Sequence, residues 1–417
     1  MKFNLFAALI LIYLMINIEG RKPKIQLSTK TRRFQRNSIQ FQPYKNDFCV
    51  YYNFWSTSLK LNEKTDPRIT LVLHSTISYM NHLEEQIKNW EGPISISIFM
   101  PTPMRNRCGR RMLFGRKECS IYGAQGQEYF RIFEWFKKMN DIRKVSLHLY
   151  FQRAMFKTCP KLYIPDTGLE KGVSVEAAYE TTLQHTKHHK VFFRVYPINV
   201  GRNIARIGMK TELFLSSDIE NYASENYESK VRVFAKKHLL KHQEKIVLIH
   251  RRFETVQGHK FPTTKRELFA MFNNHKAFVF HNFFFPRGHF IGDLEVWFNV
   301  KESRSKASLF NIYTYTNPMW EPQFVGDSRV PFHDENFPYR ARSNTHVSNL
   351  LCFEGFGFFV MNDVFTVHEG VKKRLLNNEK IALDFSKEAF RGYVDEFNRN
   401  NIRKHPNMRN VCQPLPY

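Results

Sequence analysis

The sequence lacks several features that would place it in a familiar class at once. It has 6 cysteines but no Cys-x-x-Cys pair, and it contains no Asn-x-Ser/Thr acceptor. The first absence argues against a zinc or dithiol redox site, and the second means that N-linked glycans are not expected. No internal repeat, heptad pattern or low-complexity tract is found in the 417 residues, which excludes solenoid and coiled-coil architectures.

Acidic residues are also scarce, with 38 Asp and Glu against 63 Lys and Arg, for a formal net charge of +25. A surface this basic suits anionic partners, namely nucleic acid, acidic glycans, phosphates or membranes. Apolar residues make up 42% of the chain, including 40 Phe. That content is ample for a large core and excludes a disordered protein.

The N-terminus has the pattern of a targeting sequence. Lys2 precedes an apolar run from Phe3 to Ile18 and a basic flank at Arg21. The run is short for a membrane span and suits a secretory signal, so residues 1–20 are expected to be a signal peptide or a short signal-anchor. Either one sends the rest of the chain into the secretory lumen, where nucleic acid is not an expected partner.

An oxidising lumen makes disulfides expected among the cysteines. Their pairing is not determined by the sequence, although Cys108 and Cys119 are close enough along the chain to close a local loop. The six residues are Cys49, Cys108, Cys119, Cys159, Cys352 and Cys412.

Periodicity predicts an α/β fold. Residues 21–47 are basic and lack periodicity, so we expect a stem or linker there, with order beginning near Phe48 and one domain over 48–417. A strand at Ile69–His74, a helix at Tyr79–Trp90 and a strand at Ile94–Met100 form a β-α-β unit. Further strands are expected at Lys144–Phe151, Val191–Tyr196, Leu213–Ser217 and Ile246–His250, helices at Gln127–Met139, Ile198–Lys210 and Thr264–Phe272, and strand-like runs at Phe278–Phe285 and Phe353–His368.

The most informative segment is Tyr196–Glu220, which predicts a turn, a helix and a buried strand ending in Asp218-Ile219-Glu220. Two carboxylates at the carboxyl end of a strand lie where open α/β sheets bind ligands. Hard cations such as Mg²⁺ or Mn²⁺ prefer oxygen ligands and commonly carry substrate phosphates. The same pattern also fits a solvated turn or a helix N-cap.

Several ordered motifs carry a resemblance to a known family. The chain resembles the glycosyltransferases of family 49, the LARGE-type glucuronyltransferases that build the dystroglycan glycan. The resemblance extends from about residue 68 to 395, and the block Tyr196–Glu220 is its most specific part. The motifs are Leu71–Phe99, Tyr196–Arg206, Leu213–Glu220, Arg251–Leu268, Trp320–Val325 and Phe358–Gly370.

This resemblance implies a GT-A-like fold, with a nucleotide-sugar-binding mixed sheet flanked by helices. It implies a Golgi-lumenal, type II membrane or secreted enzyme that uses Mn²⁺ and a UDP-sugar, typically UDP-glucuronic acid, with a glycan or glycoprotein acceptor. It places metal ligands at Asp218, Glu220 and His368. For His368, a core histidine is the alternative.

Arg202 and Asn203 precede the metal strand and are candidates to contact uridine or phosphate, since arginine offers a bidentate fork for phosphate oxygens. A surface salt bridge is the alternative for Arg202.

The chain departs from the family pattern in two places. Glu220 stands where the family has a second Asp, which lengthens the ligand by one methylene. Tyr339-Arg340-Ala341 stands where a Gly-x-Gly is expected in the acceptor loop, so acceptor specificity or catalysis itself is expected to differ.

Transfer also needs a carboxylate base to take the acceptor's proton. Asp334 and Glu335, in the acceptor-side loop, are the first candidates, with a solvated turn pair as the alternative. Glu321 is the next candidate, unless it is a buried structural carboxylate. Glu254 is expected to buttress the sheet edge.

Together these observations predict an inverting glycosyltransferase, in which an acceptor hydroxyl attacks the anomeric carbon as UDP leaves. Two other readings stay open. One is a catalytically inactive relative that binds glycan or nucleotide, favoured by Glu220 and the altered loop. The other is a secreted basic protein that binds acidic polysaccharide through its Lys and Arg surface.

Overall fold

Strands and helices alternate along the chain. The structure, a computed structural model, describes residues 38–100, 102, 136, 139, 141–153, 156–163 and 196–417. The strands are β1 (Ser38–Gln40), β2 (Gln42–Tyr44), β3 (Phe48–Trp55), β4 (Ile69–Thr76), β5 (Ile94–Phe99), β6 (Val145–Gln152), β7 (Lys161–Tyr163), β8 (Leu213–Asp218), β9 (Asn221–Ala223), β10 (Ile246–Thr255), β11 (Ala277–Val279), β12 (Leu309–Tyr313), β13 (Gln323–Gly326) and β14 (Gly357–Glu369).

The helices flank these strands. They are α2 (His82–Asn89), α6 (Ile198–Gly208), α7 (Tyr227–Ala235), α8 (Lys265–Asn273), α9 (Pro286–His289), α10 (Leu294–Asn299), α11 (Thr345–Phe353) and α12 (Asn377–Lys404), with short turns η1 (Ile77–Tyr79), η3 (Ile142–Lys144), η4 (Lys236–Lys241) and η5 (Pro406–Met408). Within the described ranges, no helix is both long and apolar enough to cross a membrane.

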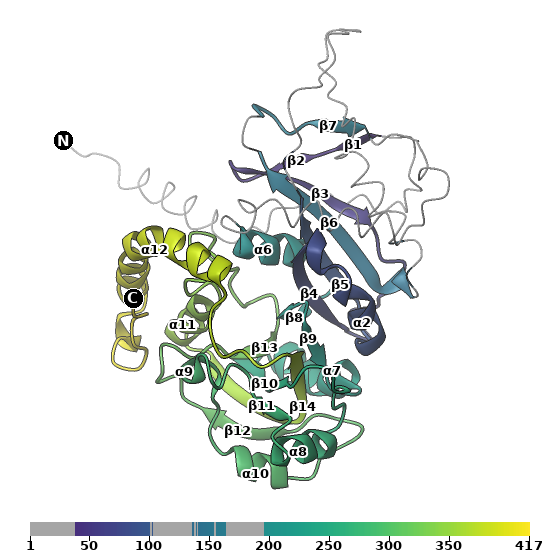
Figure 1. Cartoon of the computed structure of the whole chain (residues 1–417), viewed down its shortest axis with the longest axis vertical. Coiled ribbons are helices and arrows are strands. Elements are labelled where there is room, and N and C mark those ends of the chain that lie inside the picture. The colour runs from purple at the N-terminus through teal and green to yellow at the C-terminus, as the bar shows by residue number, and fades with distance from the viewer. Residues whose placement is uncertain are drawn as a thin grey trace, which may run out of the picture. The chain divides into compact units, whose positions relative to one another are not determined.

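One mixed sheet joins most of these strands (Figure 1). Its order is β12-β14-β10-β13-β8-β4-β5-β6-β3-β2, with β11 added to β10 and β9 to β14. The neighbours β8, β4, β5 and β6 run parallel, as do β10 and β14, while β13 is antiparallel to both β8 and β10. The mixed sheet flanked by helices confirms the predicted fold class.

The predicted β-α-β unit is present as β4, α2 and β5. All eight residues of β4 are buried, as expected for a strand between two parallel neighbours. Strand β5 alternates Ile and Ser, yet its serines do not face water. The hydroxyl of Ser95 donates to the Ala205 carbonyl at 2.6 Å, and that of Ser97 donates to the Gly201 carbonyl at 2.8 Å. The polar face of β5 therefore binds the backbone of α6.

Helix α6 lies close against the sheet because two glycines leave room. A Cβ at Gly201 would lie 2.6 Å from the Tyr150 hydroxyl, and one at Gly208 would lie 2.2 Å from Nε2 of His148. Ten of the eleven residues of α6 are buried. This close approach fixes the side chain of Arg202 against the ends of β4 and β8.

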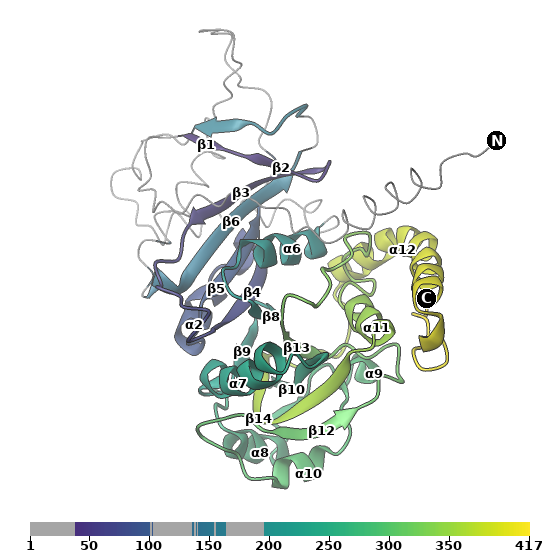
Figure 2. The same cartoon turned by 180° about the vertical axis from the view of Figure 1, so that it is seen from behind.

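The second half of the chain is more regular than its sequence predicted. Most of the predicted run Phe353–His368 lies in β14, which begins at Gly357, but of the predicted run Phe278–Phe285 only Phe278 and Val279 belong to a strand, β11. Helix α12 spans 28 residues and packs along α11, while α8 and α10 lie side by side (Figure 2). Helix α8 begins with a capping box, in which Thr264 and Glu267 bond each other's backbone amides.

The expectation that order begins near Phe48 is wrong. Strand β1 pairs with β7 and β2 pairs with β3, and Phe41 between them is 1% exposed. The described residues belong to a compact unit over residues 36–417. Most of the predicted helix near Gln127–Met139 and most of the predicted strand Val191–Tyr196 lie outside the described residues.

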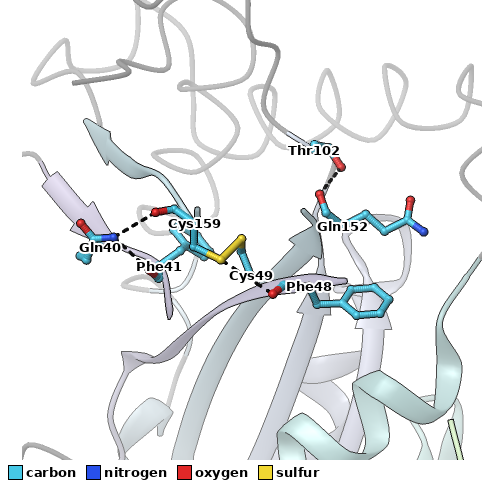
Figure 3. The surroundings of a disulfide bond; sticks show 7 residues. All are labelled: Gln40, Phe41, Phe48, Cys49, Thr102, Gln152 and Cys159. Carbon is cyan, nitrogen blue, oxygen red and sulfur yellow. Dashed lines mark hydrogen bonds between the residues drawn. A yellow bond between two sulfur atoms is a disulfide. The ribbon is translucent and has the colours of Figure 1, made fainter. Parts of the chain in front are cut away.

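Two disulfides confirm that cysteines pair. Cys49 in β3 is bonded to Cys159, and nearby Gln40 donates to the carbonyls of Phe41 and Cys159 (Figure 3). A second bond joins Cys352 in α11 to Cys412. The suggested Cys108–Cys119 pair lies outside the described residues.

Candidate active site

A cavity of about 540 Å³ opens at the carboxyl ends of β4 and β8. This is the edge of the sheet at which α/β proteins bind ligands. Strands β10 and β14 contribute one wall, and the segment 339–343 and the start of α12 contribute another. The charged side chains on its surface are Arg202, Asp218, Glu220, Arg252, Glu321, Arg340, Arg342, Lys372 and Glu379.

Asp218, the last residue of β8, is a cavity carboxylate held by side chains from several elements. The backbone register places it beside His74 of β4, whose Nε2 lies 3.3 Å from Oδ1 of Asp218. Arg202 donates from Nη2 to the same oxygen at 3.3 Å, and Nη2 of Arg252 lies 3.6 Å from Oδ2. Burial alone would raise the pKa of Asp218, but the His74 hydrogen bond and the two guanidinium charges outweigh it and hold that pKa well below its usual value.

His74 and Arg202 are themselves held in place. The Tyr196 hydroxyl lies 2.7 Å from Nδ1 of His74, and Nη1 of Arg202 donates to the Asn199 side chain and the Ser343 carbonyl at 3.1 and 3.0 Å. Arg202 is therefore a buried partner of Asp218 and not a surface salt bridge.

Glu220 and His368 line the same cavity as Asp218, so all three predicted metal ligands share one cavity. Burial and the charge of Asp218 raise the pKa of Glu220 to about 7. Burial lowers the pKa of His368 to about 4, so its ring is neutral. Because Nδ1 of His368 lies 3.3 Å from the Gly370 carbonyl, which only accepts, we assign the proton to Nδ1 and the lone pair to Nε2.

These three groups have the chemistry of a Mn²⁺ donor set, with two carboxylates and a neutral imidazole. Along the described ranges, no three His, Cys, Asp or Glu side chains lie close enough together to hold a metal ion. The donor types therefore fit the cation, and binding one requires the three side chains to converge.

The segment around the expected Gly-x-Gly has left-handed backbone, at Arg340 and Arg342 and not at Tyr339 and Ala341, which stand at the two glycine positions. Arg340 and Arg342 have φ values of 72° and 53°, in the left-handed region that costs most residues about 1–2 kcal/mol. Both side chains reach the cavity. Arg340 binds the carboxylate of Glu379, which Nζ of Lys372 also contacts at 2.9 Å.

Of the three base candidates, Glu321 alone lies on this cavity. Its Oε1 accepts a hydrogen bond from the Asn344 amide and its Oε2 accepts one from the Thr345 hydroxyl, both at 3.2 Å. These two bonds orient the carboxylate and leave further lone pairs for an incoming hydroxyl proton.

Asp334 and Glu335 do not line the cavity, contrary to the first choice made from sequence. The carboxylate of Asp334 accepts from the Tyr393 hydroxyl at 2.5 Å, and that of Glu335 accepts from the Tyr44 hydroxyl at 2.5 Å. Lys45 lies 2.7 Å from Oε2 of Glu335. Both carboxylates therefore hold the loop in place.

Asn203 is also placed away from the cavity. It donates to the His333 carbonyl at 2.8 Å and to Glu335 at 2.7 Å, so it ties α6 to the 331–337 loop. Glu254, the expected buttress, is fully buried on β10 and accepts from the Lys372 amide at 3.2 Å.

Several cavity residues had no signal in the sequence. His74 ends the predicted strand Ile69–His74 and Arg252 follows the predicted strand Ile246–His250, and neither was singled out there. His281 and His289 lie in a Phe-rich segment without periodicity. An acidic residue at a strand end reveals one ligand only. Its partners come from strands that are neighbours in the sheet but distant along the chain.

The chain is similar to known glycosyltransferases over most of its length. The family described as "Glycosyl-transferase for dystroglycan" matches residues 68–400. Beta-1,4-glucuronyltransferase 1 of Danio rerio is 26% identical over 344 residues, covering 78% of this chain and 73% of that protein. The Homo sapiens protein of the same name is 23% identical, covering 88% and 81%.

Two further matches are more limited. Xylosyl- and glucuronyltransferase LARGE2s of Gallus gallus is 22% identical over 77% of this chain and 33% of that protein. A crystal structure of GalNAc-T7 with UDP, GalNAc and Mn²⁺ covers 85% of this chain and 53% of that one at 8% identity, and its TM-score of 0.34 is too low to support an argument. The match over residues 68–400 includes every strand from β4 to β14 and the whole cavity, and the chain belongs to this family of glycosyltransferases for dystroglycan.

Proposed function

We propose that this protein transfers glucuronic acid from UDP-glucuronic acid to a glycan acceptor, with inversion at the anomeric carbon. The observation that carries the proposal is that one cavity brings together Asp218, Glu220, His368 and Glu321. Family membership and relatives named glucuronyltransferases support the reaction type and the donor.

Asp218, Glu220 and His368 would hold a Mn²⁺ ion in this reaction. When bound, the ion supplies positive charge that stabilises the departing diphosphate. His74 and Arg202 keep Asp218 ionised and fix its orientation. Lys372 and Arg340 add further positive charge on the cavity wall for the same diphosphate.

Glu321 is the proposed general base. Its two hydrogen bonds, from Asn344 and Thr345, aim the carboxylate while leaving it able to accept a proton from an acceptor hydroxyl. Most of the remaining rate enhancement would come from holding donor and acceptor in line within the cavity.

We also propose that the enzyme works in the lumen of the secretory pathway, as a secreted or membrane-anchored protein. The disulfides Cys49–Cys159 and Cys352–Cys412 support this location, because they persist in an oxidising compartment. The predicted targeting sequence at residues 1–20 supports it as well.

A second candidate is an inactive relative that binds a nucleotide or glycan. It is favoured by the environment of Asp218, whose oxygens already contact His74, Arg202 and Arg252. In this reading the arginines replace the metal as the countercharge.

Thermal unfolding separates the two candidates. A chain lacking residues 1–20 is heated with UDP or UDP-glucuronic acid, each with Mn²⁺ or EDTA. Ligand that binds the native state raises the melting temperature, by about 2.7 kcal/mol of stability at 100 times Kd. A rise that requires Mn²⁺, followed by UDP release with a glycan acceptor, supports the transferase. A rise that EDTA leaves unchanged, without UDP release, supports the inactive relative.

A further inference from the structure

Arg252 on β10 is a buried guanidinium that lacks hydrogen bonds. The residue is 6% exposed, and its Nε and Nη2 atoms have no hydrogen-bond partner among the residues the structure describes. Its nearest charge is Oδ2 of Asp218, at 3.6 Å from Nη2, which is an ion-pair distance but not a hydrogen bond. Burying charged donors without partners is costly, so their function should be sought in a ligand.

Neighbouring arginines show that this is not a general property of the site. Arg251, the preceding residue, donates from Nη1 and Nη2 to the carbonyls of Ile291 and Gly292, and only its Nε lacks a hydrogen-bond partner among the described residues. Arg202 donates to Asn199, Ser343 and Asp218. The same chain therefore pairs one buried guanidinium with backbone and another with side chains, while the donors of Arg252 stay available.

The guanidinium of Arg252 is also held in a fixed plane. Its central carbon lies 3.8 Å from the centroid of the Phe280 ring, and both residues line the cavity. Stacking on a ring restricts the guanidinium and leaves the N–H groups at its edge for a ligand. A planar fork of this kind matches a carboxylate or phosphate in two parallel hydrogen bonds.

We infer that Arg252 binds the carboxylate of a hexuronic acid in the donor sugar and selects it over the neutral hexose. This inference rests on the proposed function and identifies the sugar carboxylate as the group that Arg252 recognises. The charges that act on Arg252 besides Asp218 include that of Glu321, the proposed base. Arg252 lines the same cavity as the metal ligand Asp218 and the base Glu321, which is where the sugar of a bound donor would be.

The diphosphate has other candidates. The charges that act on Glu220 include those of Arg340 and Lys372, both on the cavity surface. A divalent ion, with Arg340 and Lys372 shared between Glu379 and the ligand, would balance the charge of a diphosphate, which leaves Arg252 for the sugar. A neutral hexose would leave the Arg252 donors unpaired, and sites that lose a hydrogen bond in this way discriminate strongly between substrates.

The test is calorimetric titration of the Mn²⁺-loaded protein with UDP, UDP-glucose and UDP-glucuronic acid. The protein is compared with Arg252→Met and with Arg232→Met. Arg232 pairs with the exposed Asp66 at 2.8 Å and does not line the cavity, so its loss controls for the lost charge. Arg252→Met should weaken the binding of UDP-glucuronic acid by about 10- to 100-fold, while the affinities for UDP and UDP-glucose stay within about threefold of wild type.

Folding is checked in the same samples. Arg252→Met loses the ion pair with Asp218 and the stacking on Phe280, so the ligand-free variant should melt somewhat below wild type, and UDP affinity kept in the same samples shows that the fold persists. Arg252→Lys keeps the charge but not the fork, so it should restore less than half of the lost preference.

Three results would overturn the inference. An equal loss for UDP and UDP-glucuronic acid would assign Arg252 to the diphosphate. A wild-type protein that binds UDP but has equal affinity for UDP-glucose and UDP-glucuronic acid would show that the site does not recognise the sugar carboxylate. A wild-type protein that binds no uridine nucleotide would refute the proposed function itself, and the UDP titration identifies that case separately.

Discussion

Replacing Asp218 with Asn should destabilise the protein even when no substrate is present. Asp218 faces Arg202 and Arg252, whose side chains are 7% and 5% exposed. The amide keeps the shape of the side chain but removes its charge. Two buried guanidinium groups would then lack the carboxylate that compensates them.

The size of the effect follows from burial. Breaking a fully buried ion pair costs about 3–5 kcal/mol. Asp218 is 34% exposed to the cavity, so solvent screens the pair, and we expect a loss of about 1–3 kcal/mol. Unfolding entropy for a unit of this size is about 0.8 kcal/mol per degree, which converts the loss to a fall of about 1–4 °C.

Differential scanning calorimetry in metal-free buffer measures this fall. Glu220→Gln is the matched control, because Glu220 faces the same cavity but has no ion pair within the described residues, and it should not lower the melting temperature. Adding Arg252→Met to Asp218→Asn removes one uncompensated charge and should recover part of the loss. An Asp218→Asn protein that melts at or above the wild-type temperature would show that Asp218 does not hold the two arginines.

Three further predictions concern stability and catalysis. Gly208→Ala should cost about 1–3 kcal/mol in urea unfolding, because its Cβ would lie 2.2 Å from Nε2 of His148; wild-type stability would contradict the close approach. Burial lowers the pKa of His148 to about 3, whereas the same histidine in the unfolded chain has a pKa near 6.5. Below pH 6.5 the unfolded chain therefore binds a proton that the folded protein does not. This histidine should lower the free energy of unfolding by about 2 kcal/mol as the pH is lowered from 7.5 to 5. A His148→Gln protein should flatten that slope of urea midpoint against pH, and an unchanged slope would exclude this histidine as a source. Glu321→Gln should slow transfer about 10²- to 10⁴-fold with donor affinity unchanged, and parallel losses in rate and donor affinity would assign Glu321 to binding.

The central elements of the fold were predictable because the apolar pattern of each one lies within a short stretch of sequence. Strands β4, β8 and β10 each begin with a mostly apolar run, and α6 follows a turn at Pro197. Strands β1 and β2 could not be predicted, since their sequence is polar and they are held by pairing with β7 and β3. Helix α12 was missed because much of it is exposed and its apolar residues do not follow one clear face.

The site was predictable only in part. Asp218 and His368 end apolar strands, which is a signal that a sequence carries. Asp334 and Glu335 look the same in sequence whether they face a substrate or a tyrosine. Their partners Tyr393 and Tyr44 lie 59 and 291 residues away along the chain. A separation of this size removes any local pattern that would reveal the contact.

The left-handed backbone at Arg340 and Arg342 has a consequence for how this cavity can change over time. At these two positions the left-handed backbone can carry either glycine or a residue with a side chain without changing its conformation, at a strain of about 1–2 kcal/mol for each residue with a side chain. Glycine and arginine codons differ by a single base. Charge on the cavity wall can therefore be gained or lost in single mutational steps, while the strands that hold Asp218 and His368 stay as they are. The substrate specificity of this fold can therefore change while the central strands keep their structure.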